Sequence, residues 1–210
     1  MSKGYEKIVK HYERCYAEHG DNHKGMDWPK LEDNHVRFQV MLQLLDWDNR
    51  YQGSSRLLDF GCGTAHLLAF IQENNLPIDE YIGLDYSQLF VDRCLEKFPT
   101  HRFIAADVLH KDFVWPEFDY AVMNGVFTEK RELSHAEMWD YFTEVISSAF
   151  HHAQRGIAFN TMSKNVDWER DDLFHVSMDE LSSFLSKKLS RNIVIRQDYR
   201  LYEFTTYLYK

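Results

Sequence analysis

The pattern of apolar and polar positions divides the chain into short apolar runs and longer amphipathic segments that follow one another in alternation. Apolar runs of strand length lie at residues 57–59, 79–85, 101–107, 118–123 and 156–160. Most of them precede a segment in which apolar residues recur every three or four positions, the spacing of a helix with one buried face. Strands that alternate with helices are typical of an α/β fold with a parallel sheet covered on both faces.

The N-terminal part of the chain has a different pattern. Residues 5–18 and 30–47 have the periodicity of helices, and the segment 19–29 between them is too polar and rich in glycine to belong to a core. We therefore expect residues 1–48 to form an N-terminal helical cap or lid. Residues 49–210 then form the main domain.

Helix starts and a hairpin are indicated in the second half of the chain. Ser134 is followed three residues later by Glu137, and Ser177 begins a similar pattern, as in the capping boxes that open helices. The β-rich runs at 192–198 and 202–209 are separated by only a few residues. That arrangement predicts an antiparallel hairpin at the end of the chain.

Length and charge narrow the class of protein. A chain of 210 residues can bury the core of one domain with a terminal extension but is short for two domains. Its 24 basic and 33 acidic residues give a formal net charge of −9, which argues against a nucleic-acid partner. The chain starts without the apolar core of a secretion signal and contains no stretch of membrane-spanning length, so we expect a cytoplasmic protein without a membrane partner.

Cysteine and histidine spacing gives no reason to expect a bound metal. Cys15, Cys62 and Cys94 are an odd and widely spaced set, unlike a disulfide framework or a zinc site. The 11 histidines show no His-Glu-x-x-His or equivalent spacing.

One turn in the chain has the composition of a ligand site. An apolar strand continues into a helix through the pattern Asp-x-Gly-x-Gly, with Asp59, Gly61 and Gly63 at its fixed positions. Glycine lets a ligand approach the backbone, and the helix start offers unpaired N–H groups, so the turn suits a nucleotide-like ligand. Dinucleotide-binding enzymes place a third glycine at the sixth position of a similar turn, but His66 stands there in this chain.

This pattern resembles motif I of the class I S-adenosylmethionine-dependent methyltransferases, whose acid and glycines surround the methionine part of the cofactor. The third glycine often found in that motif is replaced here by Ala65. The resemblance implies a Rossmann-like α/β fold with a seven-stranded, mostly parallel sheet. An antiparallel C-terminal hairpin is the hallmark of that fold and agrees with the runs at the end of this chain.

Polar residues also follow the later strands. In the resembled family, the acid at the position of Asp85 binds both ribose hydroxyls and the acid at Asp107 binds the amine of the adenine. Asn124 and Gly125 follow the fourth predicted strand, where the family lines the reacting centre. Taken singly, these acids could be helix caps or loop residues. Their joint occurrence in this order favours the cofactor site, because ligands bind at the carboxyl ends of parallel strands.

The resemblance thus implies a cofactor site built from the glycine turn, the later strand ends and the N-terminal cap. Its predicted members are Asp59, Gly61, Cys62, Gly63, Ala65, Asp85, Tyr86, Asp107, Val108, Asn124, Gly125, Tyr12, Trp28 and Arg37. Tyr12 and Trp28 are placed around the sulfonium, and Arg37 on the cofactor carboxylate. Aromatic packing onto the sheet and a solvated charge are the alternatives. Tyr5 and Tyr16 are interpreted as packing residues only.

Candidates for a catalytic base lie beyond the fourth and fifth strands, where the acceptor would be bound. His175 is the first choice because histidine is the side chain best suited to act as a base near neutral pH, and Glu129, His135 and Tyr199 are further candidates. The alternatives are a loop histidine bonded to a backbone carbonyl for His175, an exposed charge run for Glu129 and a first-turn helix position for His135.

These features predict transfer of a methyl group to an O or N nucleophile of a small molecule, because the chain carries no added recognition domain. A second hypothesis retains the cofactor but lets a nucleophile attack another carbon beside the sulfonium, which would release methylthioadenosine. A third is a binding protein without turnover. The oligomeric state is expected to be a monomer or a homodimer.

Overall fold

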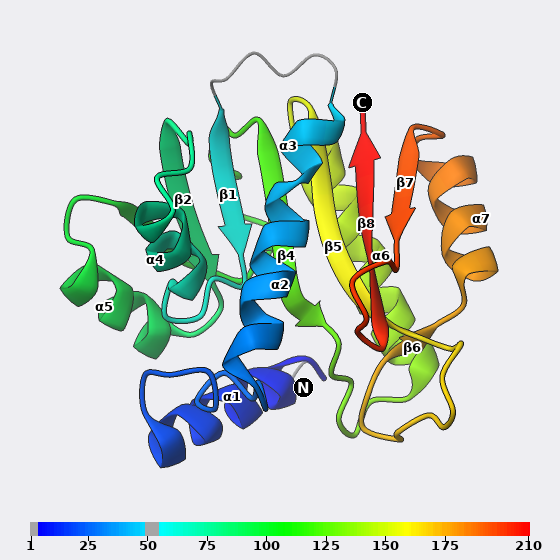
Figure 1. Cartoon of the computed structure of the whole chain (residues 1–210), viewed down its shortest axis with the longest axis horizontal. Coiled ribbons are helices and arrows are strands. Elements are labelled where there is room, and N and C mark those ends of the chain that lie inside the picture. The colour runs from blue at the N-terminus through cyan, green and yellow to red at the C-terminus, as the bar shows by residue number, and fades with distance from the viewer. Residues whose placement is uncertain (1–3, 49–54) are drawn as a thin grey trace.

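The computed structural model describes residues 4–48 and 55–210 of the chain. Its strands are β1 Arg56–Phe60, β2 Glu80–Asp85, β3 Arg102–Ala105, β4 Tyr120–Phe127, β5 Gly156–Ser163, β6 His175–Val176, β7 Ile193–Arg196 and β8 Glu203–Tyr209. They form one sheet in the order β3-β2-β1-β4-β5-β8-β7, and the short β6 pairs with β5 (Figure 1). β8 pairs antiparallel with both β5 and β7, and every other strand pairing in the described sheet is parallel. The predicted mostly parallel sheet with an antiparallel hairpin is therefore confirmed, and β6 is an addition to it.

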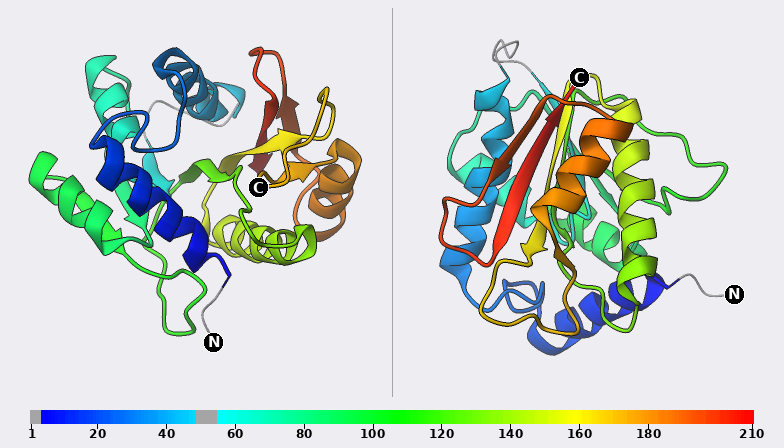
Figure 2. Two further views of the ribbon diagram at one scale, coloured as in Figure 1. Left: turned by 90° about the horizontal axis from the view of Figure 1, so that it is seen from below. Right: turned by 90° about the vertical axis from the view of Figure 1, so that its right-hand side faces the viewer.

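Helices cover both faces of the sheet (Figure 2). They are α1 Glu6–His19, α2 Leu31–Leu42, α3 Leu44–Trp47, α4 His66–Glu73, α5 Gln88–Lys97, α6 His135–His152 and α7 Met178–Lys188. The buried residues of α6 and α7 share one core with Leu58 and the other side chains on their face of the sheet. Those of α2, α3 and α4 share a second core with Leu57. The two neighbouring leucines face opposite cores because side chains alternate along a strand.

Local sequence signals placed most element ends correctly. In the capping box at α6, Ser134 Oγ accepts from the Glu137 N–H at 3.2 Å, and the Glu137 carboxylate accepts from the Ser134 N–H at 2.8 Å. The helix predicted over 30–47 is instead two helices, α2 and α3, that meet at Gln43. The predicted boundary after residue 48 coincides with the start of 49–54, which lie outside the described residues.

The fourth strand differs from its prediction. Instead of ending at a turn formed by Asn124 and Gly125, β4 continues through both residues to Phe127. Its pairing with β5 shifts register between Met123 and Phe127, and Gly125 has a φ of +81°. The Gly125 N–H leaves the ladder and donates to Asn160 Oδ1 at 2.8 Å. The pair therefore forms a bulge inside the strand, and glycine is required there by the positive φ.

The N-terminal helix lies across the carboxyl ends of the parallel strands, at the lower edge of the sheet in Figure 1. Among the described residues, no helix has the length and apolar character needed to cross a membrane. The position of α1 closes one end of the sheet, which is the end where an α/β fold binds its ligands.

Candidate functional site

A pocket lies between the carboxyl ends of the strands and the N-terminal segment, with a cavity volume of about 150 Å³. We call residues 4–30, which comprise α1 and the linker to α2, the lid. We call residues 59–64, 85–87 and 124–126, at the ends of β1, β2 and β4, the floor. Of the residues predicted to bind the cofactor, those that line the pocket are Asp59, Gly61, Cys62, Gly63, Asp85, Tyr86, Asp107, Val108, Asn124, Gly125, Tyr12 and Trp28. Ala65 and Arg37 do not line it.

The glycine turn has the backbone that its sequence predicts. Gly61 and Gly63 have φ values of +73° and +52°. A Cβ on Gly63 would lie 2.8 Å from Met26 Sδ of the lid, so the turn leaves no room for a side chain. Ala65 also has a positive φ, of 60°, but its side chain is fully buried in the core beside α4. Its small size therefore serves packing behind the turn, which corrects its placement among the pocket residues.

Asp85 fastens the end of β2 to the glycine turn. Its carboxylate accepts from the Gly63 N–H at 2.9 Å and from the Ser87 N–H at 2.8 Å. Burial raises the pKa of Asp85 to about 6, although these hydrogen bonds and those of the neighbouring backbone favour the charged form. Asp85, which sequence analysis selected as a ligand-binding residue, therefore also has a structural role, because it joins the end of β2 to the glycine turn.

Asp59 is the second buried acid of the floor. It is 3% exposed and accepts from the Tyr81 hydroxyl at 2.5 Å. Burial raises the pKa of Asp59 to about 7, and the nearby charge of Asp85 adds to the shift. Two acids that ionise near neutral pH therefore line the same pocket.

The third acid, Asp107, is bonded to the lid. The Tyr5 hydroxyl lies 3.1 Å from Asp107 Oδ1 and 2.9 Å from Oδ2, and its ring stacks on Tyr141 with centroids 4.7 Å apart. Both tyrosines line the pocket. The interpretation of Tyr5 as a packing residue only was therefore wrong. No local pattern could have paired it with an acid 102 residues away.

A second set of contacts joins the linker of the lid to the floor. Asp21 accepts from Thr64 Oγ1 at 2.7 Å and lies 2.9 Å from both His66 Nε2 and Lys97 Nζ. Burial alone would raise the pKa of Asp21, but hydrogen bonds from Lys97, Thr64 and His66 lower it to about 2. On α1, the Glu13 carboxylate accepts from Ser87 Oγ at 2.5 Å. Both parts of the lid, α1 and the linker, therefore contact the main domain through charged and hydrogen-bonded side chains.

Trp28 lies over the bulge of β4, where a Cβ on Gly125 would be 2.6 Å from its ring. The guanidinium of Arg37 lies 4.2 Å from the centre of the same ring. Arg37 Nε pairs with both oxygens of the buried Glu203 at 3.0 Å, so this structure directs the charge to β8 and not into the pocket. Its predicted contact with a cofactor carboxylate would therefore have to use the other guanidinium nitrogens.

Three buried polar atoms beside the pocket have no hydrogen-bond partner among the described residues: Asn34 Oδ1, Arg37 Nη1 and Asn124 Oδ1. Asn34 is 2% exposed, lines the pocket and lies one turn before Arg37 on α2. Buried groups of this kind normally bind a partner. Two acceptors and one cationic donor are suited to the ammonium and carboxylate of an amino acid. Sequence analysis missed Asn34, although a polar residue on the buried face of a helix could have signalled it.

The four candidates for a catalytic base, His175, Glu129, His135 and Tyr199, all lie away from the pocket lining. His175 is buried on β6, with Nδ1 2.7 Å from the Ser163 carbonyl oxygen and Nε2 accepting from the Arg170 N–H at 3.2 Å. Both ring nitrogens are occupied by backbone groups, so His175 does not act as a base in this arrangement. The structure favours the alternative interpretation of a histidine bonded to a backbone carbonyl.

His135 and Glu129 are also occupied elsewhere. His135 Nε2 lies 3.1 Å from the His175 carbonyl oxygen. Glu129 is 8% exposed and pairs with Arg131 at 3.1 Å, so it is a buried ion pair and not part of an exposed charge run. Tyr199 bonds to Thr205 at 2.9 Å. These residues stabilise the loops after β4 and β5 and give the pocket no base.

Comparison with known proteins points to the same family that the glycine turn resembles. The sequence model of a family described as "Methyltransferase domain" matches residues 58–156, which run from β1 through the glycine turn to the first residue of β5. A candidate methyltransferase of Mycobacterium tuberculosis, Rv1506c, is 27% identical over 149 residues, which are 70% of this chain and 88% of that protein.

Solved structures share the fold at low identity. The magnesium protoporphyrin IX methyltransferase of Synechocystis PCC 6803 with bound SAH superimposes with a TM-score of 0.61 at 13% identity, covering 99% of this chain and 97% of its own. A DhpI–SAM–HEP complex gives 0.65 at 12% identity, covering 99% and 98%. The family match over residues 58–156, the similarity to the mycobacterial methyltransferase, the glycine turn and the strand order together support assignment of the chain to the class I S-adenosylmethionine-dependent methyltransferase superfamily.

Proposed function

We propose that this chain transfers the methyl group of S-adenosylmethionine to an O or N nucleophile of a small molecule bound beneath the lid. The observation that carries the proposal is the convergence of Asp59, Asp85 and Asp107 with the two-glycine turn on one pocket. S-adenosylmethionine supplies a methyl group already activated by its sulfonium. The task left to the protein is to hold the donor and the acceptor in line and to exclude water.

The roles of the chain's residues follow from their chemistry. We propose that Asp85 and Asp107 bind the ribose and the adenine amine, since carboxylates accept strongly from such donors. The partnerless oxygens of Asn34 and Asn124 would accept from the ammonium group of the methionine part. Arg37 Nη1 would donate to its carboxylate.

The acceptor would enter beside the β4 bulge. Tyr12, whose hydroxyl is 3.4 Å from the Gly125 carbonyl oxygen, and Trp28 border this part of the pocket. Because the predicted base residues lie elsewhere, we propose that alignment drives the transfer and that the acceptor is already nucleophilic. The similar fold of the Synechocystis enzyme serves methylation of magnesium protoporphyrin IX, which is a small molecule, and this similarity supports a small acceptor.

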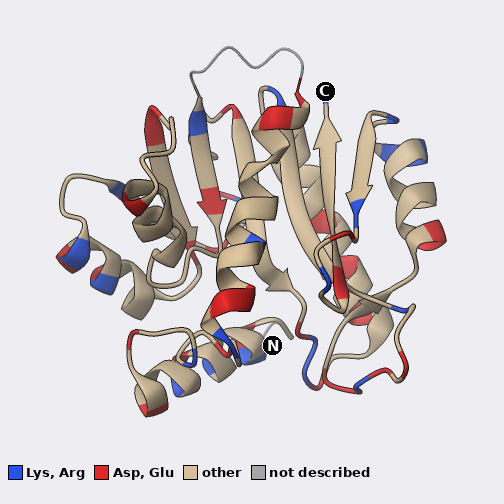
Figure 3. Ribbon diagram, viewed as in Figure 1, with Lys and Arg blue, Asp and Glu red and all other residues tan. Residues whose placement is uncertain are grey.

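We also propose that the protein acts in the cytoplasm and has no nucleic-acid partner. Its net charge of −9 opposes a phosphate backbone. Figure 3 shows Lys and Arg on helices, strands and loops, with Asp and Glu interspersed among them.

Calorimetric titration with S-adenosylmethionine and S-adenosylhomocysteine tests the site. We expect both to bind the wild type, and Asp107→Ala to bind them more weakly than the matched control Asp112→Ala, whose side chain is 73% exposed. Mass spectrometry after incubation with a panel of small nucleophiles tests the reaction. Release of S-adenosylhomocysteine supports methyl transfer, release of methylthioadenosine supports attack on another carbon, and tight binding without either product supports a binding protein.

A further inference from the structure

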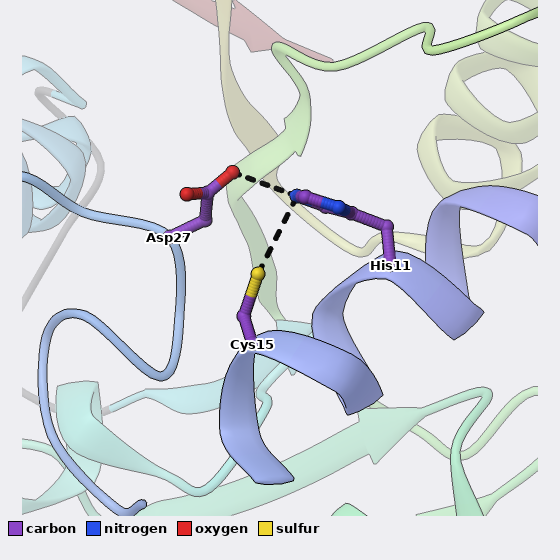
Figure 4. A group of neighbouring side chains, drawn as sticks. All are labelled: His11, Cys15 and Asp27. Carbon is purple, nitrogen blue, oxygen red and sulfur yellow. Dashed lines mark hydrogen bonds and ion pairs between the residues drawn. The ribbon is translucent and has the colours of Figure 1, made fainter. Parts of the chain in front are cut away.

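A second cluster of reactive side chains lies on the lid, outside the lining of the pocket (Figure 4). His11 and Cys15 lie one turn apart on α1, and Asp27 comes from the linker. His11 Nε2 is 2.7 Å from Asp27 Oδ2 and 3.6 Å from Cys15 Sγ. One donor atom from each of the three residues lies within 4.8 Å of the others.

The arrangement is unsuited to nucleophilic catalysis. In a cysteine–histidine–acid triad, the acid and the thiol bond to opposite nitrogens of the ring, so that the ring can take the thiol proton. Here both Asp27 and Cys15 meet the same nitrogen, Nε2. The three donor atoms instead lie within 4.8 Å of one another, a spacing that one shared cation could bridge.

We propose that His11, Cys15 and Asp27 bind a zinc ion that fastens α1 to the linker of the lid. Nitrogen, sulfur and carboxylate oxygen are the ligands zinc takes in proteins, with three of them leaving a fourth position for water. Zinc bonds of about 2.0–2.3 Å in a tetrahedron separate neighbouring donors by about 3.3–3.6 Å. The nitrogen–sulfur distance of 3.6 Å already fits this spacing.

The Asp27 carboxylate has to shift when the ion binds. The nitrogen–oxygen distance of 2.7 Å must lengthen by roughly half an ångström to reach zinc spacing. The Asp27 side chain is 40% exposed and the His11 side chain 12% exposed, so a hydrated ion can reach the cluster. On binding, the Cys15 thiol releases its proton to solvent and its sulfur bonds to the metal.

The consequence concerns the lid. Tyr12 adjoins His11, and Met26 and Trp28 adjoin Asp27, and all three neighbours line the pocket. A metal that joins α1 to the linker would therefore hold both parts of the lid together over the pocket. The ion lies outside the pocket lining and is a clasp, without a part in the methyl transfer.

The test uses the full chain with Zn²⁺ alone, and Co²⁺ as a spectroscopic substitute. We expect one ion per chain and a cobalt–thiolate charge-transfer band. Cys15→Ser should remove the band and weaken Zn²⁺ binding by roughly tenfold or more, and His11→Gln and Asp27→Asn should also weaken it. The matched control is His151→Gln, an exposed histidine at the end of α6, which should bind as the wild type does.

Hydrogen exchange distinguishes an ion that holds the two parts of the lid together from an ion that only binds at the surface. Zn²⁺ should slow exchange of the amides in residues 6–30 in the wild type and leave Cys15→Ser unchanged. Absence of the cobalt band in the folded wild type would overturn the site, as would Zn²⁺ binding that survives loss of both Cys15 and His11. Zn²⁺ binding at the site without slower exchange in the lid would overturn the clasp.

Discussion

The floor and the lid enclose the same pocket but are held by different kinds of contact. Floor residues are fixed by backbone hydrogen bonds: the Gly61 N–H donates to the Leu84 carbonyl oxygen at 2.7 Å, and the Cys62 N–H donates to the same oxygen at 3.1 Å. The lid is held by separate side-chain pairs such as Tyr5 with Asp107 and Asp21 with Thr64. Backbone contacts of a packed sheet form together, whereas side-chain pairs break one at a time. The floor therefore depends on the sheet as a whole, whereas each contact of the lid depends on a single pair of side chains.

The largest effect should come from filling the floor. Gly63→Val places a branched side chain where φ is +52° and where Met26 of the lid already lies 2.8 Å from a Cβ. We expect S-adenosylmethionine binding to weaken by roughly a hundredfold or more, about 3 kcal/mol, by calorimetry. Gly20→Val is the control, because Gly20 also has a positive φ but a Cβ there meets no atom within 4 Å. Equal losses in both variants would assign the effect to backbone strain and not to the pocket.

Removing an acid from the floor should cost less. Asp85→Ala loses charge-assisted hydrogen bonds to the proposed ribose and to Gly63 and Ser87, so we expect binding to weaken by about 1–3 kcal/mol. Asp167→Ala, in an exposed loop after β5, is the matched control. Unchanged affinity of the folded Asp85→Ala protein would contradict the role of Asp85 in the site.

The same contrast explains what the sequence could predict. Floor residues such as Asp85 stand at the ends of apolar runs, and parallel register brings those ends together, so a local pattern is enough to gather them. The capping residue Ser134 was predictable for the same reason, because its partner Glu137 is three residues away. The fold was therefore predictable wherever partners are close in sequence or fixed by strand register.

Contacts of the lid and the acceptor side could not be predicted in this way. Tyr5 and Asp107 are 102 residues apart, and nothing in either segment marks the pairing. His175 has the residue type of a base, but β6 turns both of its ring nitrogens toward backbone groups. The type of a residue indicates which chemistry its side chain could perform. Whether the side chain performs it depends on the atoms that the folded loop places beside it.

The pH dependence of stability should distinguish the floor from the rest of the molecule. The pKa of Asp59 is about 7 in the folded protein, against roughly 4 for an unperturbed carboxyl. A raised folded pKa means that its contribution to stability is complete below about pH 4 and is lost as pH rises through about 7.

We therefore expect the free energy of unfolding of the wild type to fall by about 1–2 kcal/mol more than that of Asp59→Asn between about pH 5.5 and about pH 8. Urea unfolding at several pH values measures it. Asp167→Asn, an exposed control, should keep the pH dependence of the wild type. A parallel pH profile for Asp59→Asn would show that this acid ionises normally.

The smallest effect should come from the lid and should have the opposite sign. The Tyr5 hydroxyl occupies the Asp107 carboxylate that the adenine amine is proposed to use, so the two compete. Tyr5→Phe keeps the ring on Tyr141 but removes the competing donor, and we expect S-adenosylmethionine to bind more tightly by about 0.5–1 kcal/mol. Tyr16→Phe is the control: Tyr16 packs behind Phe90 and does not itself line the pocket, so the affinity of this variant for S-adenosylmethionine should stay unchanged. Weaker binding by Tyr5→Phe would mean that the Tyr5 hydroxyl contributes to ligand binding. The lid would then be part of the binding surface, as the floor is.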